Sequence, residues 1–182
     1  MNFLKIVLQV LGILLLIPGV AYVTLRVDNS NADGPSILFP GGELVSGELY
    51  TGPEPDWSFT DDVTTVELQL VEPLSSRLIF IMESEGKVYI PSGYMRSTLG
   101  KIWKEWAVQA DEGNGLAVVR IDGTRYERQL VRIKEGPVLD GIVAKLASKY
   151  NPGSQSTPES IAAGRASIEA GDTWIFEMAP RG

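Results

Sequence analysis

The first hydrophobic feature of the chain is an apolar run from Ile6 to Leu25, in which Gln9 is the one strongly polar residue. In a helix, a run of this length spans about 30 Å, roughly the thickness of a bilayer core. A basic residue flanks each end, so the pattern predicts a transmembrane helix and a membrane anchor over residues 1–27. The small residues Gly19-Val20-Ala21 leave a cleaved signal peptide as the alternative.

The polar residues that follow the run predict a tether over residues 28–40, which contain glycine and proline. Residues 41–182 then form a single domain. Acidic residues follow Arg26, and we therefore expect the N-terminus inside and the domain outside. The prediction is a single-pass protein of the cell membrane with an extracytoplasmic (periplasmic) domain.

Beyond the tether, the hydrophobic pattern takes the short period of strands. Residues 63–71 alternate between apolar and polar side chains, which predicts a half-buried strand. The continuous apolar run within residues 77–82 predicts a strand covered on both faces. Glu85-Gly86 and Asp122-Gly123 favour tight hairpin turns. Further strands are predicted at 87–90, 116–121, 124–133 and 173–178.

Helices are predicted between these strands. One runs from about Thr98 to Ala110 and carries Trp103 and Trp106, which its apolar face is expected to bury. Stacking of one of these rings on a ligand is the alternative. An amphipathic helix is predicted over residues 137–150, and a further helix begins at Pro158 behind a Thr157 cap.

Short antiparallel strands joined by tight turns predict a mainly β (α+β) fold of six to seven strands with short flanking helices. Such strands commonly close, or partly close, into a barrel, because closure removes exposed sheet edges. The alternating βαβ order of a parallel sheet is absent from the sequence.

Composition narrows the chemistry. A net charge of −7 over 182 residues argues against nucleic acid as a partner. The chain has neither histidine nor cysteine, which excludes Ser/His/Asp and Cys/His catalysis and the usual zinc and iron ligand sets. Asp61-Asp62 is read as a solvated turn rather than a metal site. Any reaction must rest on carboxylates, hydroxyls, Lys, Arg or a bound cofactor.

The polar loop from Ser92 to Lys101 is the candidate site. Arg96, Ser97 and the helix start that follows them combine a cation, a hydroxyl and free backbone N–H groups, which suits an anion. Tyr94 is placed to hydrogen-bond a ligand.

Structural roles remain open for the same residues. Ser97 or Thr98 is a candidate helix cap, and Lys101 is spaced to pair with Glu105 one turn later.

Two basic residues share one face of a predicted strand, Arg128 and Arg132. They indicate either a dimer or ligand surface or ion pairs with nearby acids.

The order of these segments resembles the split β-barrel superfamily, which includes pyridoxamine-phosphate-oxidase-like flavoproteins and deazaflavin-dependent reductases. More narrowly, it is similar to members with an N-terminal membrane anchor. The resemblance covers roughly Asp56 to Arg181. It rests on the succession DWSF, RLIFI, EGKVYI, K-x-W, VVRIDGTRYERQLVRI, a helix ending in KY, and WIFEMAPR.

This resemblance implies an antiparallel split β-barrel, a homodimer, and FMN or a deazaflavin bound across the barrel. Arg77 opens the strand on which relatives often carry a phosphate-binding arginine. The loop that supplies the remaining phosphate donors contains Ser92, Arg96, Ser97 and Lys101. The compact Ser-Arg-Lys cluster of the oxidases is spread out here as SGYMRSTLGK.

Two functions follow. The first is a flavin- or deazaflavin-dependent oxidoreductase in which the cofactor carries the chemistry. The second is a non-catalytic, membrane-tethered module for ligand binding or assembly without a cofactor, possibly a subunit of a membrane complex.

Overall fold

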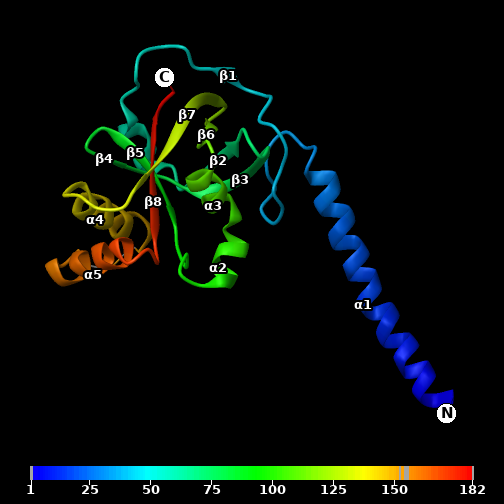
Figure 1. Cartoon of the computed structure of the whole chain (residues 1–182). Coiled ribbons are helices and arrows are strands. Elements are labelled where there is room, and N and C mark those ends of the chain that lie inside the picture. Colours follow the sequence, from blue (N-terminus) through cyan, green and yellow to red (C-terminus); the bar gives the residue numbers. More distant parts are fainter. Residues whose placement is uncertain (1, 152, 154–155, 182) are drawn as a thin grey trace.

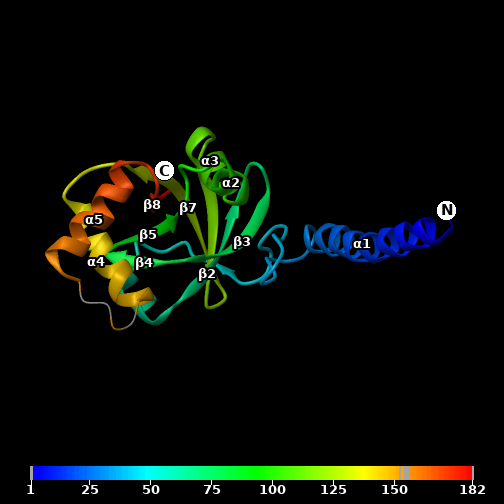
Figure 2. The same cartoon turned by 90° about the horizontal axis from the view of Figure 1, so that it is seen from below.

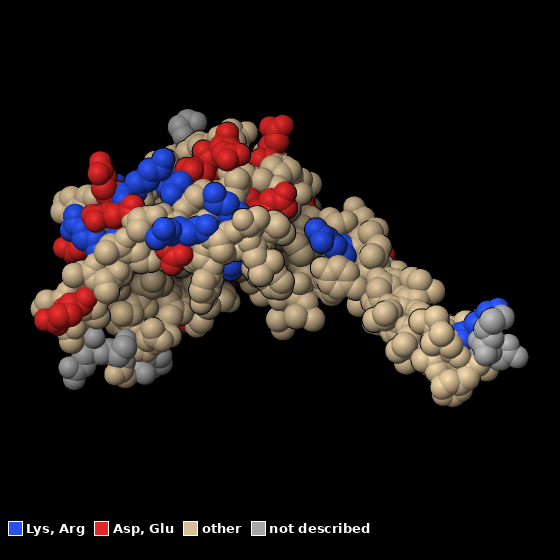
Figure 3. Space-filling model, turned by 60° about the horizontal axis from the view of Figure 1, so that its bottom comes forward, with Lys and Arg blue, Asp and Glu red and all other residues tan. Residues whose placement is uncertain are grey.

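The structure is a computed structural model that describes residues 2–151, 153 and 156–181. A long helix, α1 (Asn2–Asn29), extends away from a domain built on one curled sheet (Figure 1). The apolar side chains of α1 are exposed along its length. The helix is long and apolar enough to cross a membrane, a property shared by membrane anchors and signal sequences. Figure 3 shows it as an uncharged extension with basic atoms at its far end.

The sheet is antiparallel along its main path, in the order β3-β2-β6-β7-β8-β5-β4. The two-residue strand β1 (Glu48–Leu49) adds in parallel to the start of β7. The strands of the main path are β2 (Thr65–Leu70), β3 (Ser75–Phe80), β4 (Met82–Ser84), β5 (Lys87–Ser92), β6 (Leu116–Ile121), β7 (Thr124–Ile133) and β8 (Trp174–Pro180). The predicted mainly β fold of antiparallel strands, short helices and an N-terminal apolar helix is confirmed.

The two ends of the sheet are joined through one residue. β3 and β4 lie at opposite ends of the strand order, yet only Ile81 separates them in the chain. The sheet must therefore curl into a half-barrel. The Tyr150 hydroxyl accepts a hydrogen bond from Ile81 N (2.9 Å), and Lys149 Nζ donates to Ile81 O (2.8 Å). These two side chains fix the junction.

Both predicted hairpin turns adopt left-handed backbone conformations. The φ angles are 54° and 76° at Glu85 and Gly86, and 48° and 79° at Asp122 and Gly123. Two consecutive positive φ angles are characteristic of a type I′ turn, whose twist matches that of the flanking strands. These turns set the registers of the β4–β5 and β6–β7 pairs.

Alternation along the strands divides the apolar residues between two clusters. In β8, Phe176 packs inside the half-barrel, whereas Ile175 packs against helices on the outer face. These helices are α4 (Val138–Tyr150) and α5 (Pro158–Glu169), the latter capped by Thr157 as predicted. In Figures 1 and 2 they lie on the side of the domain remote from α1.

The predicted helix from Thr98 to Ala110 is two helices, α2 (Thr98–Trp103) and α3 (Glu105–Glu112). Lys104 separates them with a non-helical backbone (φ −108°, ψ 35°). The change of direction leaves Trp103 78% exposed, whereas Trp106 is 2% exposed. The prediction that both tryptophans are buried is therefore wrong for Trp103.

The expectation that residues 77–82 are covered on both faces is also wrong. Leu78 and Phe80 alternate outward and are exposed, while Ile79 and Ile81 are buried. Among the described strands β3 pairs only with β2, apart from a backbone bridge between Ser76 and Gly41, and it lies at the end of the strand order. Of the two helices on the outer face, α4 packs on β4, on the far side of the Ile81 junction, and α5 packs on α4.

Candidate anion-binding site

The loop between β5 and α2 is held by buried contacts. Ser92 is buried, and its hydroxyl contacts Met95 Sδ at 3.2 Å. Met95 is also buried, and its N–H donates to Asp172 O (2.8 Å). Between them, Tyr94 adopts a left-handed φ of 64° and exposes its ring. The loop therefore presents Tyr94 to solvent while Ser92 is enclosed.

Ser97 caps α2. Its Oγ accepts a hydrogen bond from Gly100 N (2.9 Å) and donates to Tyr94 O (3.1 Å). Gly100 lies so close to the loop that an added Cβ would be 1.8 Å from Tyr94 O. Arg96 and Lys101 extend into solvent, and neither forms an ion pair within the described residues. The ion pair between Lys101 and Glu105 that their spacing allows is therefore not formed.

A groove of about 300 Å³ runs beside this helix. Its walls are mainly apolar, and one cation stands at its edge. The lining residues are Tyr94, Ser97, Leu99, Gly100, Trp103 and Lys104.

Arg77 approaches the same region from β3. Its guanidinium carbon lies 5.9 Å from the centroid of the Trp106 ring, and Nη2 donates to Ser75 Oγ (2.9 Å). The Nε atom is buried and has no hydrogen-bond partner. No carboxylate among the described residues lies within ion-pair distance of Arg77. A partly buried guanidinium of this kind is incompletely satisfied.

Electrostatics couple Arg77 to Lys104. Burial lowers the pKa of Arg77 to about 10, and the charge of Glu105 acts in the opposite direction. Burial also lowers the pKa of Lys104, and the positive charge of Arg77 lowers it further. Two partly buried cations thus repel each other without a carboxylate in contact. This arrangement favours an anion.

The other buried or partly buried arginines differ from Arg77 in having carboxylate partners, although the Nε of Arg128 is also buried without a hydrogen-bond partner. Arg128 donates to Glu54 (2.8 Å) and stacks on Trp57, with 4.6 Å between the guanidinium carbon and the ring centroid. Arg132 pairs with Asp111 (2.6 Å) and stacks on Trp174. Arg128 and Arg132 therefore take the second of their predicted roles, as ion pairs that hold β7 to its neighbours.

The candidate residues fall into three groups. Arg77 lies near Lys104. Tyr94 and Ser97 line the groove together with Lys104. Arg96 and Lys101 are exposed on the adjoining loop and helix. Ser92 is committed to Met95. A phosphate group fits the free donors of Arg77 and Lys104, because the buried Nε of Arg77 is an unused donor.

Lys104 was not among the sequence candidates. The prediction of one continuous helix from Thr98 to Ala110 gave this residue no special position. Lys104 is instead the residue at which the helix breaks.

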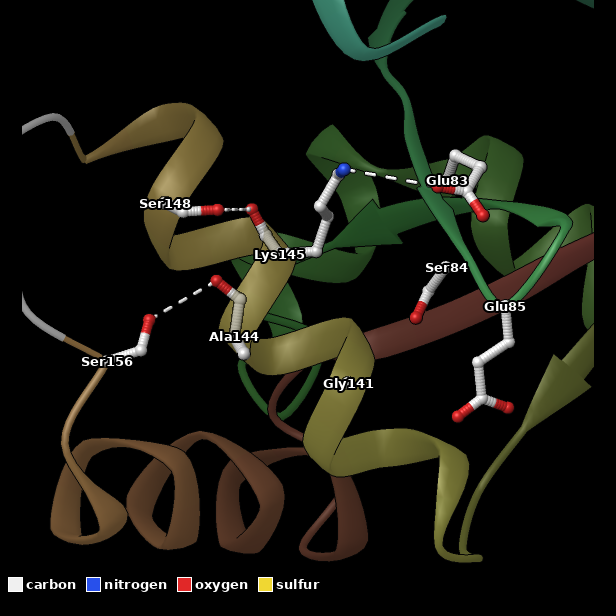
Figure 4. A pocket seen from close by; sticks show the side chains of 8 residues that line it. All are labelled: Glu83, Ser84, Glu85, Gly141, Ala144, Lys145, Ser148 and Ser156. Atoms are coloured by element: carbon white, nitrogen blue, oxygen red, sulfur yellow. Dashed lines mark hydrogen bonds and ion pairs between the residues drawn. The ribbon is translucent and has the colours of Figure 1, made fainter. Parts of the chain in front are cut away.

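A second groove, of about 420 Å³, lies between the β4–β5 hairpin and α4 (Figure 4). Its basic group is already paired, since Lys145 contacts Asp61 at 2.7 Å and Glu83 at 3.9 Å. In Figure 4, Glu85 points away from the lysine. With one paired cation between acids, this groove is less suited to an anion than the first.

Asp61 is thus used in an ion pair with α4. Among the described residues, no group of three or more carboxylates gathers as a metal site would require.

No protein-family model matches the chain, and no curated protein matches it significantly. The class of the protein therefore rests on its architecture. It is an antiparallel half-barrel with an N-terminal apolar helix, which is consistent with a split β-barrel.

Proposed function

We propose that the protein is a membrane-anchored half-barrel that binds a phosphate-bearing aromatic ligand, FMN or a deazaflavin, in the groove beside α2. The observation that carries the proposal is a pair of partly buried cations, Arg77 and Lys104, neither of which forms an ion pair within the described residues. A phosphate group would reduce the repulsion between the two cations and accept a hydrogen bond from the unused Nε–H of Arg77. Charge-assisted hydrogen bonds of this kind are about twice as strong as neutral ones.

The groove supports an aromatic ligand as well as an anionic one. Its volume of about 300 Å³ is at the lower end of the range typical of small-ligand sites. Tyr94 and Trp103 line it and offer ring faces for offset stacking. In this arrangement the rings orient the ligand, and the two cations hold its phosphate.

A bound flavin would supply hydride and electron transfer, which suits a chain without histidine or cysteine. The part of the protein is then limited to binding, orientation and charge. On this proposal Arg77 and Lys104 neutralise the phosphate, and Tyr94 and Trp103 restrict water at one face of the ring system. The reaction class is an oxidoreduction. The homodimer and the extracytoplasmic location stay predictions.

The test is a titration of the full chain in mild detergent with FMN and with riboflavin, which lacks the phosphate. Arg77→Gln should weaken FMN binding by roughly 10- to 100-fold, the value of a lost charged hydrogen bond, and should leave riboflavin binding unchanged. Arg165→Gln is the control, because Arg165 lies on α5 and pairs with Asp140 and Glu169.

Two outcomes would contradict the proposal. If neither FMN nor a deazaflavin binds, the flavin assignment is wrong. If Arg77→Gln weakens FMN and riboflavin equally, Arg77 does not contact the phosphate.

A non-catalytic assembly module is the second candidate. It is favoured by the exposed apolar side chains of α2, among them Leu99 and Trp103. A chain that binds no flavin but co-purifies from its membrane with other proteins would support this function instead.

A further inference from the structure

The short helix α2 turns its apolar side chains outward. Within the described residues, these side chains pack against no other element, although they adjoin a buried loop. The exposed members of this set, called here the α2 patch, are Tyr94 (76%), Leu99 (75%), Ile102 (68%) and Trp103 (78%). Apolar residues that gather on a surface in this way mark an interaction site.

A second exposed apolar group lies in the tether. Ile37 and Leu38 are 89% and 82% exposed. The turn that carries them is fixed beside α1, because Phe39 contacts the Tyr22 ring with 5.3 Å between centroids. Asn29 Nδ2 also donates to the carbonyls of Phe39 (3.1 Å) and Pro40 (2.7 Å). The tether is therefore folded back at the base of the helix.

Both apolar groups lie toward the side from which α1 leaves the domain. In Figure 1, α1 descends past the domain, α2 lies at its lower end, and β1 lies at its upper end. Figure 2, seen from below, places α2 between α1 and the α4–α5 pair. If α1 crosses a membrane, the bilayer surface lies on the α2 side.

We infer that the α2 patch and the Ile37–Leu38 turn dock on the surface of the bilayer in which α1 is anchored. The inference rests on the membrane anchor of the proposed function and does not require a flavin. Trp and Tyr favour the membrane interface, and amphipathic elements insert leucine and isoleucine at the acyl boundary.

Charge specifies the lipid. Arg96 and Lys101 flank the α2 patch, and both are exposed without an ion pair within the described part of the chain. The whole chain carries a net charge of −7, so an anionic surface repels most of the domain. A local pair of cations beside interfacial aromatic rings fits anionic headgroups. The domain therefore lies against the bilayer at α2, and the groove beside α2 opens at headgroup level.

The absence of cysteine allows a direct test on the full chain. Single cysteines at Ile102, Leu38 and Leu49 would carry an environment-sensitive fluorophore in nanodiscs of phosphatidylcholine and phosphatidylglycerol in equal parts. Leu49 is the control, since it lies on β1 at the opposite end of the domain and is also exposed. Quenching by spin-labelled lipid reports contact with the bilayer.

The expected result is a blue-shifted emission and several-fold stronger lipid quenching at 102 and 38 than at 49. Quenching at 102 as weak as at 49 would overturn the inference. A blue shift at 102 without lipid quenching would also overturn it, because the α2 patch would then be covered by a second copy or by another protein.

The charge contribution is tested separately with Arg96→Glu and Lys101→Glu in one chain. Quenching at 102 should fall in the mixed nanodiscs and change little in phosphatidylcholine alone, whereas Arg165→Glu should have no effect. If Arg165→Glu lowers the quenching at 102 as much as the double variant does, a headgroup contact by Arg96 and Lys101 is excluded. If position 102 contacts lipid in a chain that binds no FMN, the proposed function is contradicted and the membrane contact of α2 is supported.

Discussion

At the scale of single residues, two tryptophans three positions apart have opposite environments. Trp106 packs in the half-barrel with its ring centroid 5.6 Å from that of Phe176. Trp103 lies on the surface, because the backbone changes direction at Lys104. The same side chain therefore contributes to the core at one position and to a surface site at the other.

These environments predict different stability effects. Trp106→Ala should lower the free energy of unfolding by about 3–5 kcal/mol, the usual cost of deleting a buried tryptophan. Trp103→Ala, the matched control, should change it by no more than about 0.5 kcal/mol. Urea unfolding of the full chain in mild detergent measures both. Equal losses would mean that Trp103 is buried in solution.

Arg77 and Lys104, the two cations proposed to hold the phosphate, predict a pH dependence of ligand binding. The pKa values of Arg77 and Lys104 are both lowered, the former to about 10. An anionic phosphate prefers the protonated cations, so FMN affinity should be highest near neutral pH. It should fall as the pH rises through the lowered pKa values of Lys104 and Arg77.

Titrations with FMN at a series of alkaline pH values measure this loss. Lys104→Met should weaken binding overall and leave only the loss that accompanies deprotonation of Arg77, near pH 10. Riboflavin, without a phosphate, is the control. An FMN affinity that stays constant as the pH rises past 10 would exclude both cations from the site.

At the scale of elements, the position of α2 depends on one glycine. An added Cβ at Gly100 would collide with Tyr94 O, whereas one at Gly93, in the same loop, would meet open space. Gly100→Ala should therefore displace α2 and accelerate amide exchange across residues 94–104. Gly93→Ala should leave exchange unchanged. Hydrogen-exchange mass spectrometry measures both, and unaltered exchange in Gly100→Ala would show that the loop moves freely to accommodate a methyl group.

Strands and turns could be predicted because their signals are local. The alternation of residues 63–71 and the Asp122-Gly123 turn need no knowledge of distant neighbours. The break at Lys104 could not be predicted in this way. It accompanies the close approach of Gly100 to Tyr94 and the burial of Trp106 among residues from other strands, and neither is visible in the periodicity.

The residues of the candidate site also differ in whether the sequence alone could identify them. Arg77 was predicted from the resemblance to the split β-barrel superfamily, and the structure adds its unpaired Nε. Ser92 was predicted from its polarity, yet its side chain is buried against Met95. Lys104 depends on the helix break, so its nearness to Arg77 is known only from the fold.

At the scale of the whole molecule, the tether is bound to the domain through Asp33. Its carboxylate accepts hydrogen bonds from Val45 N (2.8 Å) and Ser46 N (3.1 Å) and pairs with Arg120 (2.8 Å). Arg120 in turn pairs with Glu67 on β2. The Asp33 carboxylate and the Arg120 guanidinium therefore help to fix the tether on the domain, together with the backbone bridge between Gly41 and Ser76.

Acid should release this contact. Hydrogen bonds, first among them those from Ser46, hold the pKa of Asp33 well below its ordinary value of 3.8. The stabilisation is therefore fully present above pH 3.8 and is lost as the pH falls through the lowered value. Asp33→Asn should reproduce part of this loss at neutral pH.

Amide exchange at Val45 and Ser46 is the measurement, and we expect it to rise roughly 10-fold in Asp33→Asn. Asp28→Asn is the control, since Asp28 is exposed and its side chain has no recorded partner in the described chain. Equal exchange in the two variants would mean that the tether is held by other contacts.

The position of β8 has a consequence for biosynthesis. β8 pairs with both β7 and β5, so it joins the β3-β2-β6-β7 part of the sheet to the β5-β4 part. Until residues 174–180 leave the ribosome, these parts have unpaired edges that can bind other chains. A chain inserted through α1 would hold those edges beside the membrane during this interval. We expect such a half-sheet to stay open to pairing with other chains until β8 is added.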